Sequence, residues 1–155
     1  MQWLSSTIAP LQSLIGFLYK KSKTNDVHKK QLLTELRDNL NVFKNAFMDN
    51  TPAENVIDLL SNSAIRNAVK ENFTFSKLKE GKITQKIIKE DRNKRYPGWT
   101  AEKLTDKIDE KIQELKNVKQ LNGGNIKKIE QKVSIKLSNL YFRMKLLADF
   151  IQSGS

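Results

Sequence analysis

The strongest constraint on the fold is the spacing of apolar residues in the last part of the sequence. These residues recur three or four positions apart, which places them on one face of an α-helix. The series runs Ile126, Ile129, Val133, Leu137, Leu140, Met144, Leu147 and Ile151. A helix that carries the whole series is about 39 Å long at about 1.5 Å per residue. Such a helix buries its apolar face against other helices.

Three earlier segments repeat this spacing, and together with the last one they predict a helical bundle. The three series run from Leu4 to Leu18, from Leu33 to Phe47 and from Leu104 to Leu115. Three prolines and six glycines leave few breaks, and no segment alternates with period two. We therefore predict an all-α, single-domain protein over residues 1–155. Its architecture is an up-and-down bundle with four long helices, one or two short helices and no β-sheet.

Local signals mark where the predicted helices begin and end. The starts are marked by residues that cap helices: Asn25 or Asp26, Thr51 in the capping-box sequence Thr51-Pro52-Ala53-Glu54, and Thr100. The breaks are marked by turn formers: Ser61-Asn62-Ser63, the type II turn sequence Tyr96-Pro97-Gly98-Trp99, and Gly123-Gly124. The least regular part is 73–99, which separates the second and third helix pairs. A short helix is expected there, somewhere between Ser76 and Arg92.

The positive charge of the chain is concentrated in its middle. The formal net charge is +11, from 28 Lys and Arg against 17 Asp and Glu. Residues 61–99 hold 10 basic and 4 acidic groups, a net +6, against +1 for residues 1–60 and +4 for residues 100–155. Basic and aromatic residues gather at the end of this segment and form the predicted partner-binding patch: Lys86, Lys89, Arg92, Lys94, Arg95, Tyr96 and Trp99.

An acidic protein surface is the partner that we predict for this patch. An anionic membrane and a nucleic-acid strand are alternatives, because both present the same charge. Nucleic acid is the weakest of the three, because 23 of the 28 basic residues are lysines, which lack the bidentate fork of arginine. Tyr96 and Trp99 leave two interpretations open. Their rings are either exposed to a partner or packed onto the core beside the turn.

The N-terminal segment offers a second candidate surface. It is uncharged up to Tyr19, but its Ser and Gln residues make it a poor membrane span, and it lacks the basic start of a signal peptide. We therefore expect a cytoplasmic protein, with peripheral membrane attachment or membrane disruption through residues 3–23 as the alternative. That membrane face consists of an apolar stripe and a terminal lysine cluster: Trp3, Leu4, Ile8, Leu11, Ile15, Leu18, Lys20, Lys21 and Lys23. A core helix is the preferred interpretation, because the stripe matches the other helices.

The sequence carries no recognisable catalytic constellation. It has no cysteine, and its single histidine, His28, follows a helix cap in a lysine-rich stretch and is expected at the surface. An acidic stripe at four-residue spacing is the one arrangement that resembles a cation site: Glu102, Asp106, Glu110 and Glu114. Lysines run beside it at ion-pair spacing, so a solvated helix face is the preferred interpretation. We expect no enzyme activity, no metal and no cofactor.

These observations predict a binding or adaptor module that presents a basic surface to an acidic partner. Self-association through the last helix is a further possibility, because apolar residues lie beyond its main stripe: Ile135, Phe142, Leu146 and Phe150. A wide apolar face is typical either of deep burial or of a partner helix.

Overall fold

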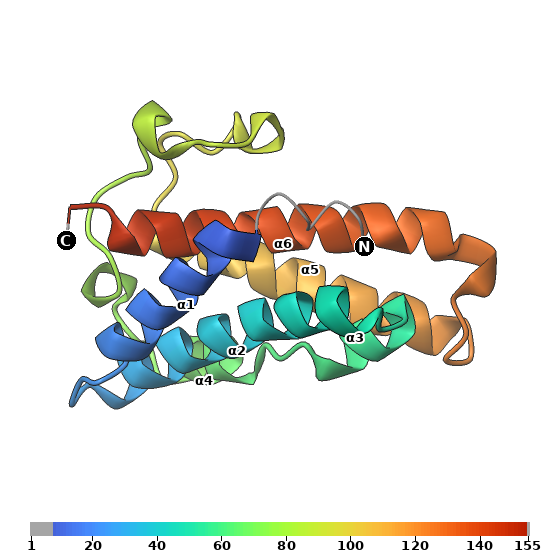
Figure 1. The fold of residues 1–155 in the computed structure, drawn as a ribbon. Helices are drawn as coiled ribbons and strands as arrows, with labels where there is room; N and C mark the ends of the chain where they lie inside the picture. The colour runs from blue at the N-terminus through green and yellow to red at the C-terminus, as the bar shows by residue number, and fades with distance from the viewer. Residues whose placement is uncertain (1–7, 155) are drawn as a thin grey trace.

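The computed structural model describes residues 8–154, and over that range the regular secondary structure is helical (Figure 1). The helices are α1 (Ile8–Lys21), α2 (Val27–Asp49), α3 (Ala53–Leu59), α4 (Ser63–Lys70), α5 (Ala101–Leu121) and α6 (Glu130–Gln152). Short 3₁₀ turns are η2 (Phe75–Lys77), η3 (Gln85–Ile87), η4 (Asp91–Asn93) and η5 (Lys127–Ile129). The described range contains no strand, only an isolated bridge between Lys82 and Thr100. The predicted all-α fold class is confirmed.

Helix α6 occupies the centre of the structure. It contacts α1, α2, α3 and α5, as well as η3 and η4 (Figure 1). Every residue of α6 from Leu140 to Ile151 is buried. The loop between α5 and α6 contains Gly123 and Gly124, which have φ angles of 64° and 82°. Glycine adopts these angles readily, so the predicted break lets α6 turn back along α5.

Two of the predicted caps close helices as expected. The side chain of Asp26 accepts a hydrogen bond from the backbone N–H of Lys29 at 3.1 Å and caps α2. The hydroxyl of Thr100 accepts one from the backbone N–H of Lys103 at 3.2 Å and caps α5. Each bond satisfies a donor that the first helical turn leaves unpaired.

The predicted capping box at Thr51 is wrong. Helix α3 begins at Ala53, its N-cap is Pro52, and no side chain caps it. Asn50 has a left-handed conformation, with φ 55°, and the backbone N–H of Thr51 donates to the carbonyl of Ala46 at 3.0 Å. Thr51 therefore belongs to the end of α2 and is not free to start α3. The expected interruption at Ser61-Asn62-Ser63 does occur, since α3 ends at Leu59 and α4 begins at Ser63.

The short helix expected between Ser76 and Arg92 is also wrong, because this stretch forms only three-residue 3₁₀ turns. Here the backbone pairs with residues further along the chain. The N–H of Ile83 donates to the carbonyl of Trp99, and the N–H of Gly98 donates to the carbonyl of Ile83, both at 2.8 Å. The predicted turn closes this loop, because Trp99 N–H donates to the carbonyl of Tyr96 at 3.0 Å and Gly98 has φ 91°.

We call residues 79–99 the basic arm, because they hold seven Lys and Arg against three Asp and Glu. The arm lies along α6 on the side away from α5 (Figure 1). The side-chain amide of Asn93 donates to the carbonyl of Phe142 at 3.1 Å, and Lys79 donates to the carbonyl of Ser153. This cover explains why α6 is buried on all sides from Leu140 to Ile151. It also accounts for three residues of the wide apolar face, since Phe142, Leu146 and Phe150 are buried within the chain itself.

Candidate functional site

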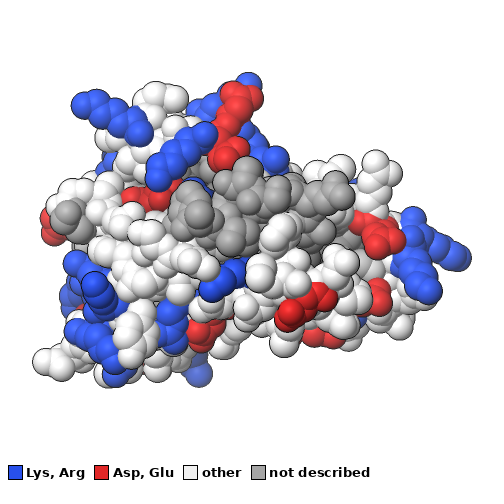
Figure 2. Space-filling model, in the orientation of Figure 1, with Lys and Arg blue, Asp and Glu red and all other residues white. Residues whose placement is uncertain are grey.

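The five basic residues of the predicted patch are all exposed, and two of them, Lys89 and Arg92, also fasten the arm to α6. Lys89 pairs with Asp149 of α6, with 3.2 Å between Nζ and Oδ1. Arg92 donates through Nη1 to Ser138 Oγ at 2.6 Å, and its guanidinium lies 4.3 Å from the centre of the Phe142 ring. Figure 2 shows basic side chains over the arm and also near the α1–α2 turn, so the positive charge on this face extends beyond the patch.

Tyr96 is not available to a partner, which corrects its place in the predicted patch. Its side chain is 1% exposed, and its ring packs edge-on against Trp99 with 4.7 Å between centroids. The turn at Pro97 and Gly98 folds both rings toward the protein. Trp99 is half-buried, and its outer face is covered by the ammonium group of Lys103 at 4.3 Å. Of the two interpretations left open by the sequence, packing onto the core beside the turn therefore holds for both aromatic residues.

The hydroxyl of Tyr96 joins two arginines. It accepts a hydrogen bond from Arg143 Nε at 2.8 Å and another from Arg95 Nη2 at 3.1 Å. Burial of the phenol opposes its ionisation, but these two donors outweigh burial and lower the pKa of Tyr96 below its usual value. The phenol oxygen thus holds an arginine of the arm beside an arginine of α6.

Next to this pair is a small cavity that we call the Arg143 recess. It has a volume of 140 Å³ and is lined by residues from the arm, α5 and α6: Arg95, Lys111, Glu114, Leu115, Lys136, Asn139 and Arg143. Arg143 is 5% exposed. Among the described residues, no carboxylate forms an ion pair with it, although a buried charge is costly when it lacks a counter-ion.

Two larger hollows, of 550 and 370 Å³, adjoin the recess and share Asn139 with it. Together the three hollows form what we call the basic groove, defined by Arg92, Lys94, Arg95, Lys111, Lys136 and Arg143. Only Glu90, Asp91 and Glu114 add negative charge to its lining. The sequence patch missed Lys111, Lys136 and Arg143, because they come from helices far away in the chain. One signal was present, since Arg143 lies between apolar residues of the last helix.

Glu114 binds the two lysines of the recess. It forms ion pairs with Lys111, at 3.0 Å, and with Lys136. Hydrogen bonds from Lys136 and Lys111 lower its pKa to about 2, from 4.5. The stabilisation by this carboxylate is therefore complete above pH 4.5 and is lost as the pH falls toward 2.

Replacing Glu114 with glutamine should lower stability at neutral pH and weaken its dependence on acid. At pH 7 we expect the free energy of unfolding of Glu114→Gln to be about 1 kcal/mol lower than that of the wild type. The loss is small because the ion pairs of Glu114 are partly exposed. The difference should disappear near pH 2, and urea unfolding at a series of pH values measures it. Glu110→Gln, which removes an exposed pair with Lys107, is the control. A difference that is the same at every pH contradicts this prediction.

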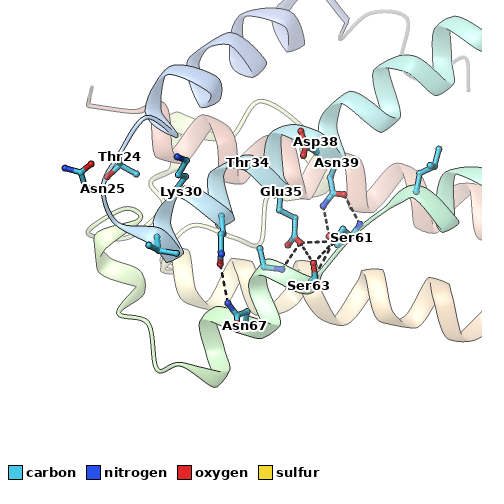
Figure 3. Close-up of a pocket in the computed structure, with 14 residues that line it drawn as sticks. Thr24, Asn25, Lys30, Thr34, Glu35, Asp38, Asn39, Ser61, Ser63 and Asn67 are labelled. Atoms are coloured by element: carbon cyan, nitrogen blue, oxygen red, sulfur yellow. Dashed lines mark hydrogen bonds between the residues drawn. The ribbon is translucent and has the colours of Figure 1, made fainter.

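A separate hollow lies between α2, the loop before it and the α3–α4 connection, with a volume of 1070 Å³. Figure 3 shows Glu35 and Asn39 pointing from α2 toward Ser61 and Ser63. Glu35 accepts hydrogen bonds from both serine hydroxyls and from the backbone N–H groups of Ala64, at 2.7 Å, and Ile65. Burial raises the pKa of Glu35 despite these bonds. Its carboxylate is engaged in holding the start of α4.

The apolar stripe of the N-terminal helix faces the core. Leu11, Leu14 and Leu18 are at most 4% exposed, and Ile15 packs against them as a half-buried residue. Lys20, Lys21 and Lys23 are exposed. The remaining residues of the proposed membrane face, Trp3, Leu4 and the side chain of Ile8, lie outside the described residues. None of the helices in the described range has the length and apolar character needed to cross a bilayer.

The other candidates for chemistry are dispersed. His28 is half-buried rather than fully exposed, with its ring 5.9 Å from that of Phe73. Within residues 8–154, no three His, Asp or Glu side chains gather at a spacing that holds a metal ion, and this includes the acidic stripe on α5. Comparisons of the chain with protein-family models, with curated proteins and with solved structures find no match.

Proposed function

We propose that this protein is a non-catalytic binding module that holds an acidic segment of a partner protein in the basic groove. The observation that carries this proposal is the convergence of arginines. Three of the five arginines in the chain, Arg92, Arg95 and Arg143, line adjoining hollows together with three lysines. An extended segment with several carboxylates is the partner that matches a groove with several separate cations.

An acidic protein accounts for the groove better than the two alternatives do. A nucleic-acid strand gains much of its affinity from base stacking, and the buried ring of Tyr96 offers no stacking surface. A membrane needs an exposed apolar face beside the cations, and the described leucines of α1 are in the core. In this proposal the four longer helices form one up-and-down bundle in a single cytoplasmic domain, and the bundle is the frame that carries the groove.

A charge-reversal experiment tests the proposed function. Lys94→Glu with Arg95→Glu changes two exposed residues of the groove, whereas Lys89 and Arg92 fasten the arm and are less suitable. With a fluorescent deca-glutamate peptide, we expect this double variant to bind about tenfold more weakly than the wild type. Fluorescence anisotropy at low salt measures the affinity, and a thermal melt confirms that the variant is folded.

The matched control is Lys127→Glu with Lys128→Glu, which makes the same change of charge at exposed residues of η5, outside the groove. Its affinity should stay within about twofold of the wild type, apart from the general effect of net charge. Equal losses in the two double variants would mean that only net charge attracts the peptide. Tighter binding of single-stranded DNA or of anionic vesicles than of the peptide would favour one of the other partners.

A further inference from the structure

We infer that the Arg143 recess binds a phosphate monoester, carried by a phosphoserine or phosphothreonine of the acidic segment. This inference rests on the proposed function and specifies the chemistry of the partner at one point. Its basis is a buried guanidinium that no described carboxylate pairs with, since Glu114 of the same recess pairs with Lys111 and Lys136, beside a second arginine that shares the same acceptor.

The first step concerns the missing counter-ion. Arg143 is almost completely removed from water, and among residues 8–154 its guanidinium has one hydrogen-bond acceptor, the hydroxyl of Tyr96. That bond uses Nε and leaves both terminal nitrogens for another partner. Two adjacent N–H groups of a guanidinium match two oxygens of a phosphate or a carboxylate. An anion in the recess would therefore pair the buried charge and stabilise the site.

The second step concerns Tyr96, which acts as a positioning residue. Its oxygen accepts from Arg143 and Arg95 at once, so the two guanidinium groups, which ordinarily repel each other, are held around one atom. Arg95 is exposed and comes from the arm, whereas Arg143 is buried and comes from α6, and both line the recess. A ligand that enters beside Arg95 can reach Arg143 with its terminal oxygens. Without the phenol oxygen, nothing described fixes the orientation of this pair.

The third step distinguishes a phosphate monoester from other anions. A phosphorylated side chain carries a charge of about −1.5 to −2 and three terminal oxygens, which is enough for both arginines. A carboxylate has two oxygens and a single charge. Lys111 and Lys136 already pair with Glu114, so the ligand is not needed to neutralise them, and the two arginines are the groups left to bind it. A small cavity of 140 Å³ accepts the end of a side chain more easily than a backbone diester with nucleotides on both sides.

The experiment compares three synthetic decapeptides of the same acidic sequence that differ at one central position. That position carries phosphoserine, serine or glutamate, and isothermal titration calorimetry measures each affinity for the full chain. We expect the phosphoserine peptide to bind about tenfold more tightly than the serine peptide, with the glutamate peptide between them. Inorganic phosphate should compete with the phosphoserine peptide, and chloride at the same ionic strength should not.

Three variants test whether the tighter binding of the phosphoserine peptide depends on the Arg143 recess. Arg143→Lys and the exposed Arg95→Gln should each remove most of the tenfold preference for phosphoserine, and Arg95→Gln remains informative if the buried variant does not fold. Tyr96→Phe should weaken binding of the phosphoserine peptide much more than binding of the serine peptide, a difference that a general loss of structure does not produce. Arg66→Gln is the matched control, because Arg66 is an exposed arginine of α4 that pairs with Asp109 outside the groove.

The possible results separate the inference from the proposed function. If the serine and phosphoserine peptides bind equally well, the recess is not a phosphate site, although the basic groove still binds acidic protein. If neither peptide binds, the proposed function itself is wrong. If an oligonucleotide without terminal phosphate binds more tightly than the phosphoserine peptide, the preference for a monoester is overturned. Loss of the preference in Arg66→Gln would also overturn it, because a distant charge would then suffice.

Discussion

Replacing Asp149 with alanine is expected to lower the free energy of unfolding by about 3–5 kcal/mol, because the change leaves the buried ammonium group of Lys145 without its ion-pair partner. Asp149 and Lys145 lie one turn apart on α6, 3.4 Å from each other, with side chains that are 6% and 7% exposed. Asp149 also forms an ion pair with Lys89 of the basic arm. Without the carboxylate, the buried side chain of Lys145 loses its ion-pair partner and the arm loses an attachment point. Urea unfolding followed by circular dichroism measures the change.

Two further variants identify the cause of this loss. Asp91→Ala removes an acidic residue of the arm whose side chain is 94% exposed and whose ion pair with Lys94 is long, at 4.0 Å. The free energy of unfolding should therefore fall by less than about 0.5 kcal/mol. Lys145→Met together with Asp149→Leu replaces both buried charges with apolar groups of similar size. We expect this double variant to recover most of the lost stability, as is typical when a complete buried pair is replaced. If it is as unstable as Asp149→Ala, the damage comes from packing and not from the stranded charge.

Replacing Glu35 with alanine should lower the free energy of unfolding by about 2–4 kcal/mol. Its carboxylate accepts hydrogen bonds from Ser61, Ser63, Ala64 and Ile65, and so connects the middle of α2 to the first turn of α4. Alanine leaves the backbone N–H groups of Ala64 and Ile65 without this acceptor, and the Ile65 N–H is buried. Hydrogen exchange should show the same loss locally, as faster exchange of the α4 amides.

The pH dependence gives a second measurement on Glu35. Burial raises its pKa in the folded protein, so its contribution to stability is greatest below pH 4.5 and declines as the pH rises through the folded pKa. The difference between the wild type and Glu35→Ala should therefore be larger in mild acid than at neutral pH. Asp38→Ala is the control on the same helix, because Asp38 is exposed and pairs only with its neighbour Arg37 among the described residues. A loss of stability in that variant equal to the loss in Glu35→Ala would contradict the prediction.

Much of the helical structure follows from signals that are local in the sequence. The spacing in the last segment identified α6, although the helix begins at Glu130 and not at Ile126, where the apolar series starts. Asp26 and Thr100 marked the starts of α2 and α5, because an amphipathic stripe and a capping side chain act within a few residues. The errors arose where a distant contact decides the local structure. Thr51 looks like a cap, but its backbone closes α2. Ile83 lies in a stretch with helical spacing, but it pairs with Trp99.

The candidate site was predictable only in part, for the same physical reason. Charge density identified the arm and brought Arg95 to attention, but composition does not tell which cations face solvent and which hold the arm on α6. The recess needs Lys111, Lys136 and Arg143, and these residues meet only after α5 and α6 pack. Tyr96 could be classed as a core residue or as a contact residue. Its hydroxyl accepts hydrogen bonds from two arginines of different elements, and the spacing along the chain does not reveal these contacts.

The central position of α6 has a consequence for the order in which the chain can fold. Among the described helices, α6 is the last to leave the ribosome, yet its residues from Leu140 to Ile151 complete the core for α1, α2, α5 and the arm. Until that segment has emerged, the leucines of α1 and α2 have no permanent cover, and Lys89 and Arg92 have nothing to dock on. Folding of this domain is therefore delayed until α6 has emerged, and until then the growing polypeptide exposes apolar surface that chaperones recognise.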